Sequence, residues 1–225
     1  MTFAELRRAV WAANRQLPAL GLVVMHSGNV SGIDRGAGLV LIKPSGVDYE
    51  TLRPDDLAVV DLDGVPVGPD RVPDGVASDL RPSVDTTHHL ALYRGDLSIG
   101  GVVHTHSNHA TAWATIGEPI PCALTAMADE FGGEIPCAPY TDNDGDHIGD
   151  AILSARTRAP AVLLANHGVF AFGPSPATAL KTAAMVEDAA RTLVIAMGLG
   201  SPSPIAHEEI EKWWKRYHET YGQPT

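Results

Sequence analysis

Apolar residues at helical spacing predict long helices at both ends of the chain. Residues 2–21 carry an apolar position every three or four residues after Thr2, a candidate N-cap. Residues 176–197 give the longest predicted helix, which Gly198 ends. A last helix is expected at about 207–221, with a largely polar surface.

Shorter apolar runs between these helices predict the strands of a sheet, because they are bounded by turns rich in Gly, Asn and Asp. Strands are expected at 22–25, 29–33, 39–43, 58–61, 65–67, 99–104, 161–166 and 169–173, and shorter helices at 85–93, 108–115 and 146–156. Residues 68–82 form a long polar loop. We predict a single α/β domain over residues 1–225, with a mixed or antiparallel sheet covered by helices.

Composition and charge narrow the range of functions. The chain has 225 residues, 44% of them hydrophobic, which suits one domain with an ordinary core. Its formal net charge is −11 and it has no basic run, so neither nucleic acid nor an anionic membrane surface is expected as a partner. It shows neither a membrane-spanning apolar run nor a signal-peptide pattern, so we expect a cytoplasmic protein. The two cysteines are too few for a disulfide framework.

Two histidines at the end of an apolar strand mark a candidate metal site. His104 and His106 are two residues apart, and such side chains point to the same face of a strand. His167 follows another apolar strand, and Gly168 after it leaves room for a close approach. Three histidines with an open fourth position are typical of catalytic zinc, and Asp85 is a candidate carboxylate ligand. The short His-x-His pattern alone also fits ordinary surface histidines.

Three turn-rich segments offer groups that bind a phosphate monoester. Residues 28–31 and 43–46 lie at strand ends, and residues 82–83 precede a predicted helix. Exposed backbone N–H groups, hydroxyls and a lysine are suited to this ligand. Each segment taken alone also fits an ordinary turn with a helix cap. Asp129 and Tyr221 are not distinguished by any local pattern.

Taken together, these segments resemble one known family. They are Gly28-Asn-Val-Ser31, Ile42-Lys-Pro-Ser-Gly-Val-Asp48, Pro82-Ser-x-Asp-Thr86, Gly100-Gly-Val-Val-His-Thr-His-Ser107, Ala128-Asp129, Ile135-Pro-Cys137, Asn166-His-Gly168 and Tyr221-Gly-Gln223. Over nearly its whole length the chain resembles the class II aldolase/adducin family, and within it the L-ribulose-5-phosphate 4-epimerases. Each segment is weak alone, but the set is highly specific.

The resemblance implies a fold, an assembly and a metal. The fold is a central, largely antiparallel β-sheet flanked by helices, and the assembly is a homotetramer with active sites between subunits. His104, His106 and His167 are implied as ligands of zinc, or of another divalent ion such as manganese, with Asp85 as the carboxylate at the metal.

The resemblance also implies how a phosphorylated sugar is bound. The implied contacts are Gly28, Asn29, Lys43, Ser45, Gly46, Ser83 and Val84. Val84 stands where the epimerases have a second serine, so it can offer only a backbone N–H. Residues 68–82 form a longer loop than in those enzymes, and Trp213 and Trp214 replace a His-Tyr pair. These departures affect the prediction of the exact substrate more than the prediction of the type of reaction.

The implied activity is that of an isomerase, which interconverts L-ribulose 5-phosphate and D-xylulose 5-phosphate. The C3–C4 bond breaks in a retro-aldol step and forms again on the other face of the aldehyde, while zinc stabilises the enediolate. Asp129 and Tyr221, supplied by a neighbouring subunit, are implied as the two proton-transfer residues. Two acid–base groups on opposite sides suit an inversion of configuration.

Three other functions stay open at this point. A zinc hydrolase using bound hydroxide would explain the histidines but give no use to Asp129 and Tyr221. A metal-dependent sugar-phosphate aldolase would share the metal site, but family aldolases usually carry a Glu where this chain has Asp85. An adducin-like interaction domain would not need the three histidines and Asp85.

Overall fold

The computed structural model describes residues 1–221 and contains one continuous sheet. Its strands are β1 (Asn29–Asp34), β2 (Leu39–Ile42), β3 (Ala58–Asp61), β4 (Gly101–Thr105), β5 (Cys137–Ala138), β6 (Ala161–Leu164) and β7 (Gly168–Gly173). They lie in the order β3-β2-β1-β4-β7-β6-β5. Neighbouring strands are antiparallel, except that β5 runs parallel to β6.

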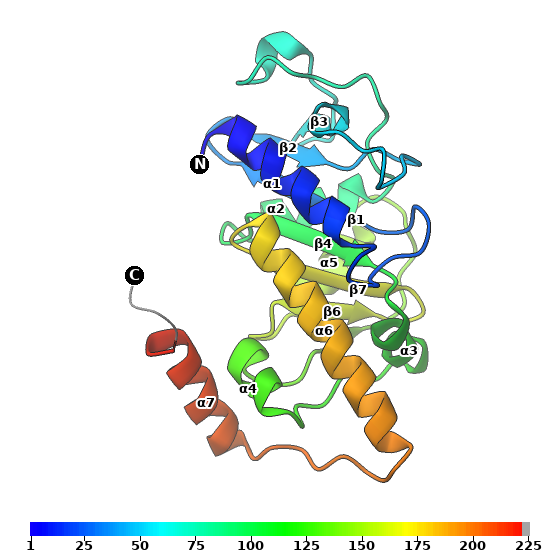
Figure 1. The fold of residues 1–225 in the computed structure, drawn as a ribbon, viewed down its shortest axis with the longest axis vertical. Coiled ribbons are helices and arrows are strands. Elements are labelled where there is room, and N and C mark those ends of the chain that lie inside the picture. Colours follow the sequence, from blue (N-terminus) through cyan, green and yellow to red (C-terminus); the bar gives the residue numbers. More distant parts are fainter. Residues whose placement is uncertain (222–225) are drawn as a thin grey trace.

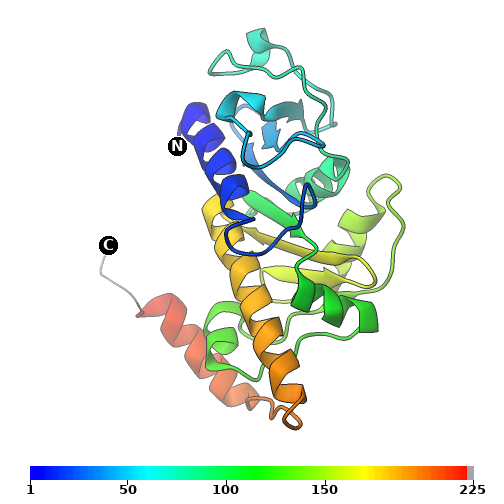
Figure 2. The same cartoon turned by 45° about the vertical axis from the view of Figure 1, so that its right-hand side comes forward.

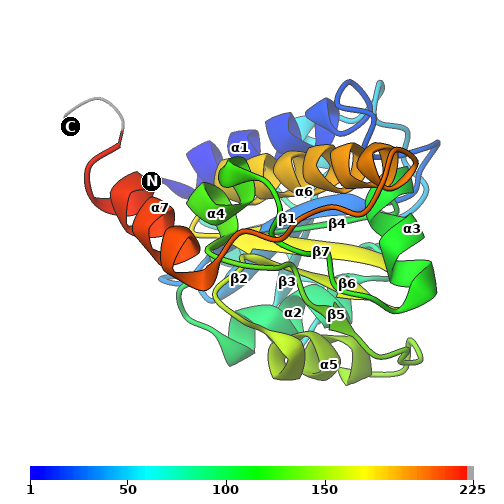
Figure 3. The same ribbon diagram turned by 90° about the horizontal axis from the view of Figure 1, so that it is seen from below.

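Helices cover both faces of this sheet. They are α1 (Phe3–Gln16), α2 (Thr86–Gly95), α3 (Asn108–Ile116), α4 (Thr125–Phe131), α5 (His147–Ala155), α6 (Pro176–Met197) and α7 (His207–Glu219), with 3-10 turns η1 (Pro54–Asp56) and η2 (Pro69–Arg71). Figure 3 shows α1, α3, α4 and α6 on one face and α2 and α5 on the other, with α7 beside α4. Figures 1 and 2 show α1 and α6 side by side along the sheet. The predicted fold class is confirmed.

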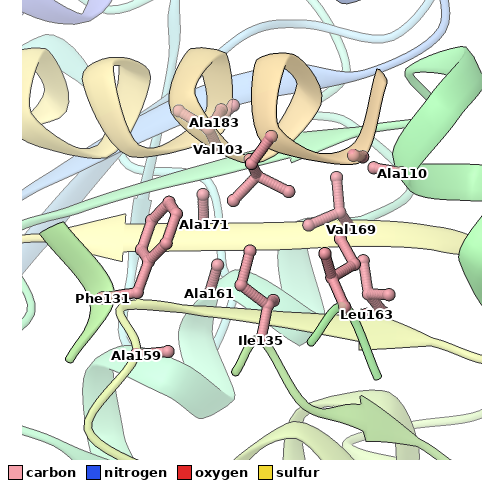
Figure 4. Packing of buried hydrophobic residues seen from close by; sticks show 14 of the residues in the cluster. Val103, Ala110, Phe131, Ile135, Ala159, Ala161, Leu163, Val169, Ala171 and Ala183 are labelled. Carbon is pink, nitrogen blue, oxygen red and sulfur yellow. The ribbon is translucent and has the colours of Figure 1, made fainter. Parts of the chain in front are cut away.

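The largest part of the core lies between the sheet and the layer that contains α6. Figure 4 shows Val103, Val169 and Leu163 of the central strands packed beneath Ala183 of α6, with Phe131 of α4 at one end of the cluster. The four residues of β6 are all buried, because both faces of the sheet are covered by helices. A second cluster packs the other face against α2 and α5.

A row of glycines lets the start of α6 rest directly on the sheet. Gly32 of β1 pairs with Gly101 of β4, which pairs in turn with Gly173 of β7. A Cβ atom on Gly101 would collide with the backbone of Ser175 and Pro176, and one on Gly32 would lie 2.9 Å from the Pro176 ring. The Ser175 side chain caps α6 at this point by accepting a hydrogen bond from the Thr178 N–H.

The long loop at 68–82 is tied to α1 by a buried ion pair. Arg7 is 3% exposed, and its Nε donates to Asp74 at 2.8 Å while its guanidinium also donates to the Val76 carbonyl at 2.6 Å. The arginine hydrogen bonds also lower the pKa of Asp74, although burial alone would raise it.

Four details of the predicted secondary structure were wrong. Residues 22–25 form no strand but a turn in which Met25 has a φ of 55°, and residues 65–67 form only an isolated bridge to β3. Two elements were not predicted, namely α4 and β5. The seven residues of α4 have no side-chain N-cap, and β5 is two residues long, so neither leaves a recognisable periodic pattern.

Replacing Gly101 by Ala is expected to lower the free energy of unfolding by about 3 kcal/mol, the upper range for overpacking a core, because the new methyl group meets backbone atoms that cannot rotate away. Urea denaturation measures this loss. Gly68→Ala is the matched control, since Gly68 has a φ of −75° and open space around its Cβ position. Equal stabilities of the two variants would contradict the role of the glycine row.

Candidate functional site

Three histidine side chains converge at one end of the central strands. His104 lies in β4 and His106 just beyond it, while His167 lies in the turn between β6 and β7. Because β4 and β7 pair in antiparallel fashion, the end of β4 meets the start of β7. One nitrogen of each imidazole lies within 4.8 Å of the others, and Nε2 of His104 is 3.0 Å from Nε2 of His106. This set of nitrogen donors fits a divalent metal ion.

The ring of His104 is held in a fixed orientation and tautomer. Its Nδ1 lies 3.1 Å from the carbonyl oxygen of Val169. A carbonyl only accepts hydrogen bonds, so Nδ1 carries the proton and Nε2 keeps its lone pair for a ligand. Phe170 stacks on the same ring, with centroids 4.2 Å apart and an interplanar angle of 17°.

Desolvation favours the neutral form of all three imidazoles, although only His104 is fully buried. It lowers the pKa of His104 to about 3, although the nearby Asp85 carboxylate acts in the opposite direction. Burial also lowers the pKa of His106, and burial together with His106 lowers the pKa of His167. Neutral imidazoles are the form that binds metal.

Two glycines make room for this cluster. A Cβ atom on Gly168 would lie 2.6 Å from the ring of His106, so the glycine predicted to allow a close approach does so. Gly28 has a φ of 83°, and a Cβ atom there would lie 2.7 Å from the carbonyl oxygen of His104. Larger residues at either position would displace a histidine or its strand.

Asp85 lies beside the cluster in a network of short polar contacts. Asn29 is the cross-strand partner of His104, so their side chains share one face of the sheet. The Asn29 amide donates to Asp85 at 2.6 Å and to Ser83 at 3.0 Å. Burial alone would raise the pKa of Asp85, but His104, His89 and the Asn29 amide stabilise its carboxylate, and the pKa is lowered.

Within residues 1–221 the group of converging ligand atoms consists of the three histidines alone. Asp85 is therefore a neighbour whose charge reaches the imidazoles, and its role as a ligand stays a prediction.

The three segments expected to bind phosphate lie together. Pro44 forms a bridge with Pro82, and the Ser45 N–H donates to the Arg81 carbonyl at 3.0 Å, which brings residues 43–46 next to Ser83. Gly46 has a φ of 68°, a conformation suited to glycine in a tight turn. Val84 is 82% exposed, so its side chain makes no part of the core.

Lys43 is buried within this group. Its Nζ lies 4.7 Å from the ring centroid of Tyr49, and the Tyr49 hydroxyl donates to the carbonyl of Gly28 at 2.6 Å. Burial lowers the pKa of Lys43, while Asp48 acts in the opposite direction. Tyr49 thus joins two of the three segments, and it was not predicted from the sequence.

Phe170 was also missed, because it contacts His104 only through the sheet. The pairing of β4 with β7 brings His104 and Phe170 together, and no short sequence pattern marks such a pair. A predicted register between β4 and β7 is the only signal that could have indicated Phe170.

The two predicted proton-transfer residues lie elsewhere in the chain. Asp129 belongs to α4, and Tyr221 follows α7 and is 65% exposed. Figures 1 and 3 show α4 and α7 at the end of the sheet opposite α3, the helix that follows the His-x-His segment. One chain therefore does not bring Asp129 or Tyr221 to its own histidines. Gly222 and Gln223, which complete the terminal motif, lie outside the described residues.

The model of the class II aldolase and adducin N-terminal domain matches residues 8–194. The chain belongs to the class II aldolase and adducin family. The histidine cluster lies where the end of β4 meets the start of β7.

Individual family members are similar over almost the whole chain. The chain is 42% identical to L-ribulose-5-phosphate 4-epimerase UlaF of Salmonella paratyphi B, over 97% of this chain and 99% of that protein. L-fuculose 1-phosphate aldolase has a similar structure, with a TM-score of 0.85, 26% identity and coverage of 95% and 96% of the two chains. A putative aldolase/epimerase/decarboxylase, YgbL from Klebsiella pneumoniae, gives a TM-score of 0.80 at 26% identity, over 95% of this chain and 99% of that one.

In the part of the chain that the structure describes, no helix combines the length and apolar character needed to cross a membrane. The cytoplasmic location stays a prediction.

His106→Ala is expected to weaken zinc binding at least about a hundredfold, because one of the three converging nitrogens is lost. Competition with a chromophoric chelator measures the dissociation constant. The control is His26→Ala, since His26 is exposed and outside the cluster. Zinc binding of unchanged strength in His106→Ala would show that the ion is held elsewhere.

Proposed function

We propose that this protein is a metal-dependent L-ribulose-5-phosphate 4-epimerase, which interconverts L-ribulose 5-phosphate and D-xylulose 5-phosphate. The observation that carries the proposal is the convergence of three imidazoles, of which His104 is buried, beside a half-buried carboxylate and a buried lysine. The 42% identity to enzymes named for this reaction, over nearly the full length of both chains, supports the same assignment.

In this proposal His104, His106 and His167 hold the metal ion. An all-imidazole donor set favours zinc over manganese. When bound, the ion would supply positive charge that stabilises the negative charge developing on the substrate oxygens as the C3–C4 bond breaks. Asp85 completes the site, and Asn29 and Ser83 keep its carboxylate oriented.

The phosphate group binds at the junction of the three turn segments in this proposal. The contacts are Gly28, Asn29, Lys43, Ser45, Gly46, Ser83 and the backbone of Val84. Lys43 supplies the positive charge, since a phosphate dianion at its Nζ counteracts the effect of burial on its pKa. The acidic chain thereby binds an anion through a local site.

Asp129 and Tyr221 transfer the protons in the proposed reaction. One of them takes the proton of the C4 hydroxyl as the C3–C4 bond breaks, and the other returns a proton after the aldehyde has presented its opposite face. Within residues 1–221, Oδ1 of Asp129 has no hydrogen-bond partner, so this oxygen is not committed to a contact inside the chain.

The separation of these residues from the histidines supports a shared site. Because α4 and α7 lie at the far end of the sheet from α3, we propose a homotetramer in which Asp129 and Tyr221 of one subunit act at the histidines of the next.

A sugar-phosphate aldolase is the second candidate, because the structure is similar to that of L-fuculose 1-phosphate aldolase. An adducin-like interaction domain is less well supported, since it would give no use to the neutral histidine cluster and the buried lysine.

Incubation with L-ribulose 5-phosphate and zinc is expected to yield D-xylulose 5-phosphate as the main product. A coupled assay for D-xylulose 5-phosphate and direct detection of glycolaldehyde phosphate distinguish the two candidates. Chelation of the metal should abolish turnover, and added zinc should restore it. Accumulation of glycolaldehyde phosphate as the main product would instead favour the aldolase.

Tyr221→Phe is expected to lower kcat about a hundredfold or more while leaving zinc affinity unchanged, because it removes one proton-transfer group and no ligand. Steady-state kinetics and chelator competition measure the two quantities. Tyr140→Phe is the matched control, since Tyr140 is also exposed but lies outside the proposed site. Unchanged kcat in Tyr221→Phe would remove this residue from the mechanism.

A further inference from the structure

Glu187 of α6 reaches across to the first turn of α3. Its Oε1 accepts a hydrogen bond from the backbone N–H of His109 at 3.0 Å and lies 2.7 Å from Nδ1 of the same residue. Its Oε2 accepts from the N–H of Ala110 at 2.9 Å. The glutamate side chain is only 13% exposed. One partly buried carboxylate thus accepts from two of the backbone donors of this helix turn.

This arrangement replaces the usual cap of a helix. The residue at the N-cap position normally accepts from these backbone N–H groups, and serine is a preferred residue there. Ser107 occupies the N-cap of α3, yet its side chain makes no capping hydrogen bond. Its hydroxyl is buried and finds no partner among the residues that the structure describes. Glu187, far away in the sequence, has taken over the capping function.

The position of α3 bears directly on the metal centre. The helix begins at Asn108, two residues after His106, and His106 lies beyond the last residue of β4. The strand therefore fixes one side of the segment that carries His106, and the cap fixes the other. A negative charge at a helix N-terminus is also favoured by the helix dipole.

We propose that Glu187 is a positioning residue for the metal centre. By capping α3 in place of Ser107, its carboxylate holds the segment of His106 in the geometry that lets the three imidazoles converge. The inference rests on the metal site of the proposed function.

The test compares Glu187→Gln with Asp188→Asn in the full chain. An amide nitrogen cannot accept a hydrogen bond, so Gln leaves at least one of the donors at the start of α3 without a partner. Asp188 is its exposed neighbour on the same helix and loses the same charge when changed to Asn. Two quantities are measured: the zinc dissociation constant by chelator competition, and backbone amide exchange at residues 107–112 without metal.

Glu187→Gln is expected to raise the zinc dissociation constant about fivefold to tenfold and to speed amide exchange at His109 and Ala110, with Asp188→Asn unchanged in both. Glu187→Asp, which keeps the charge but shortens the reach, should change both quantities in the same direction and serves if the Gln variant does not fold.

Faster exchange with unchanged zinc affinity would overturn the inference, because Glu187 would then be a helix cap only. Equal effects of the two substitutions would overturn it as well, since they would reflect charge alone. If the unaltered chain binds no zinc, the proposed metal site itself fails, and the inference fails with it. Measuring the unaltered chain first therefore separates the two failures.

Discussion

The antiparallel pairing of β4 with β7 determines how the rest of the site is built. It brings the end of one strand to the start of the other, so that His104 and His106 meet a histidine more than sixty residues further along the chain. The same pairing places the Val169 carbonyl at Nδ1 of His104 and Phe170 against its ring. A slip of one residue would turn every side chain of β4 to the other face. Register, more than any single contact, thus defines the donor set.

Charge within the site is divided between two neighbouring groups. Desolvation lowers the pKa values of the imidazoles, whereas the hydrogen bond from the Asn29 amide favours the ionised form of Asp85 against the effect of burial. Neutral nitrogen donors and one carboxylate together suit a divalent cation that must also leave a position open for substrate. Lys43 is buried, and burial disfavours its positive charge. A bound anion would compensate for this loss of hydration. In the proposed function, these two groups therefore bind ions of opposite sign.

How well the sequence predicts an element of this fold depends on the length of the residue pattern that the element leaves. The long helices and the apolar strands carry their own periodicity, and the His-x-His pair marks its own strand end. The helix α4 is too short to be recognised, and the turn at residues 22–25 contains apolar residues that imitate a strand. Contacts such as those of Tyr49 and Glu187 join segments that are distant in sequence, so no local pattern marks them.

Only the resemblance to a known family indicated Asp129 and Tyr221 as proton-transfer residues, because no local sequence pattern marks them. Their placement away from the histidines of the same chain is a property of the arrangement of elements in space, and residue types alone do not reveal it.

The row formed by Gly32, Gly101 and Gly173 has a consequence for how such a sequence can evolve. Every other amino acid carries a Cβ atom, so no amino-acid replacement at Gly101 avoids the backbone at the start of α6. Substitution elsewhere in a core can be compensated by a smaller neighbour, but a neighbouring backbone cannot become smaller. Any single substitution at Gly101 is thus destabilising, unless α6 as a whole shifts away from the sheet. The row therefore sets how closely the start of α6 can approach the sheet.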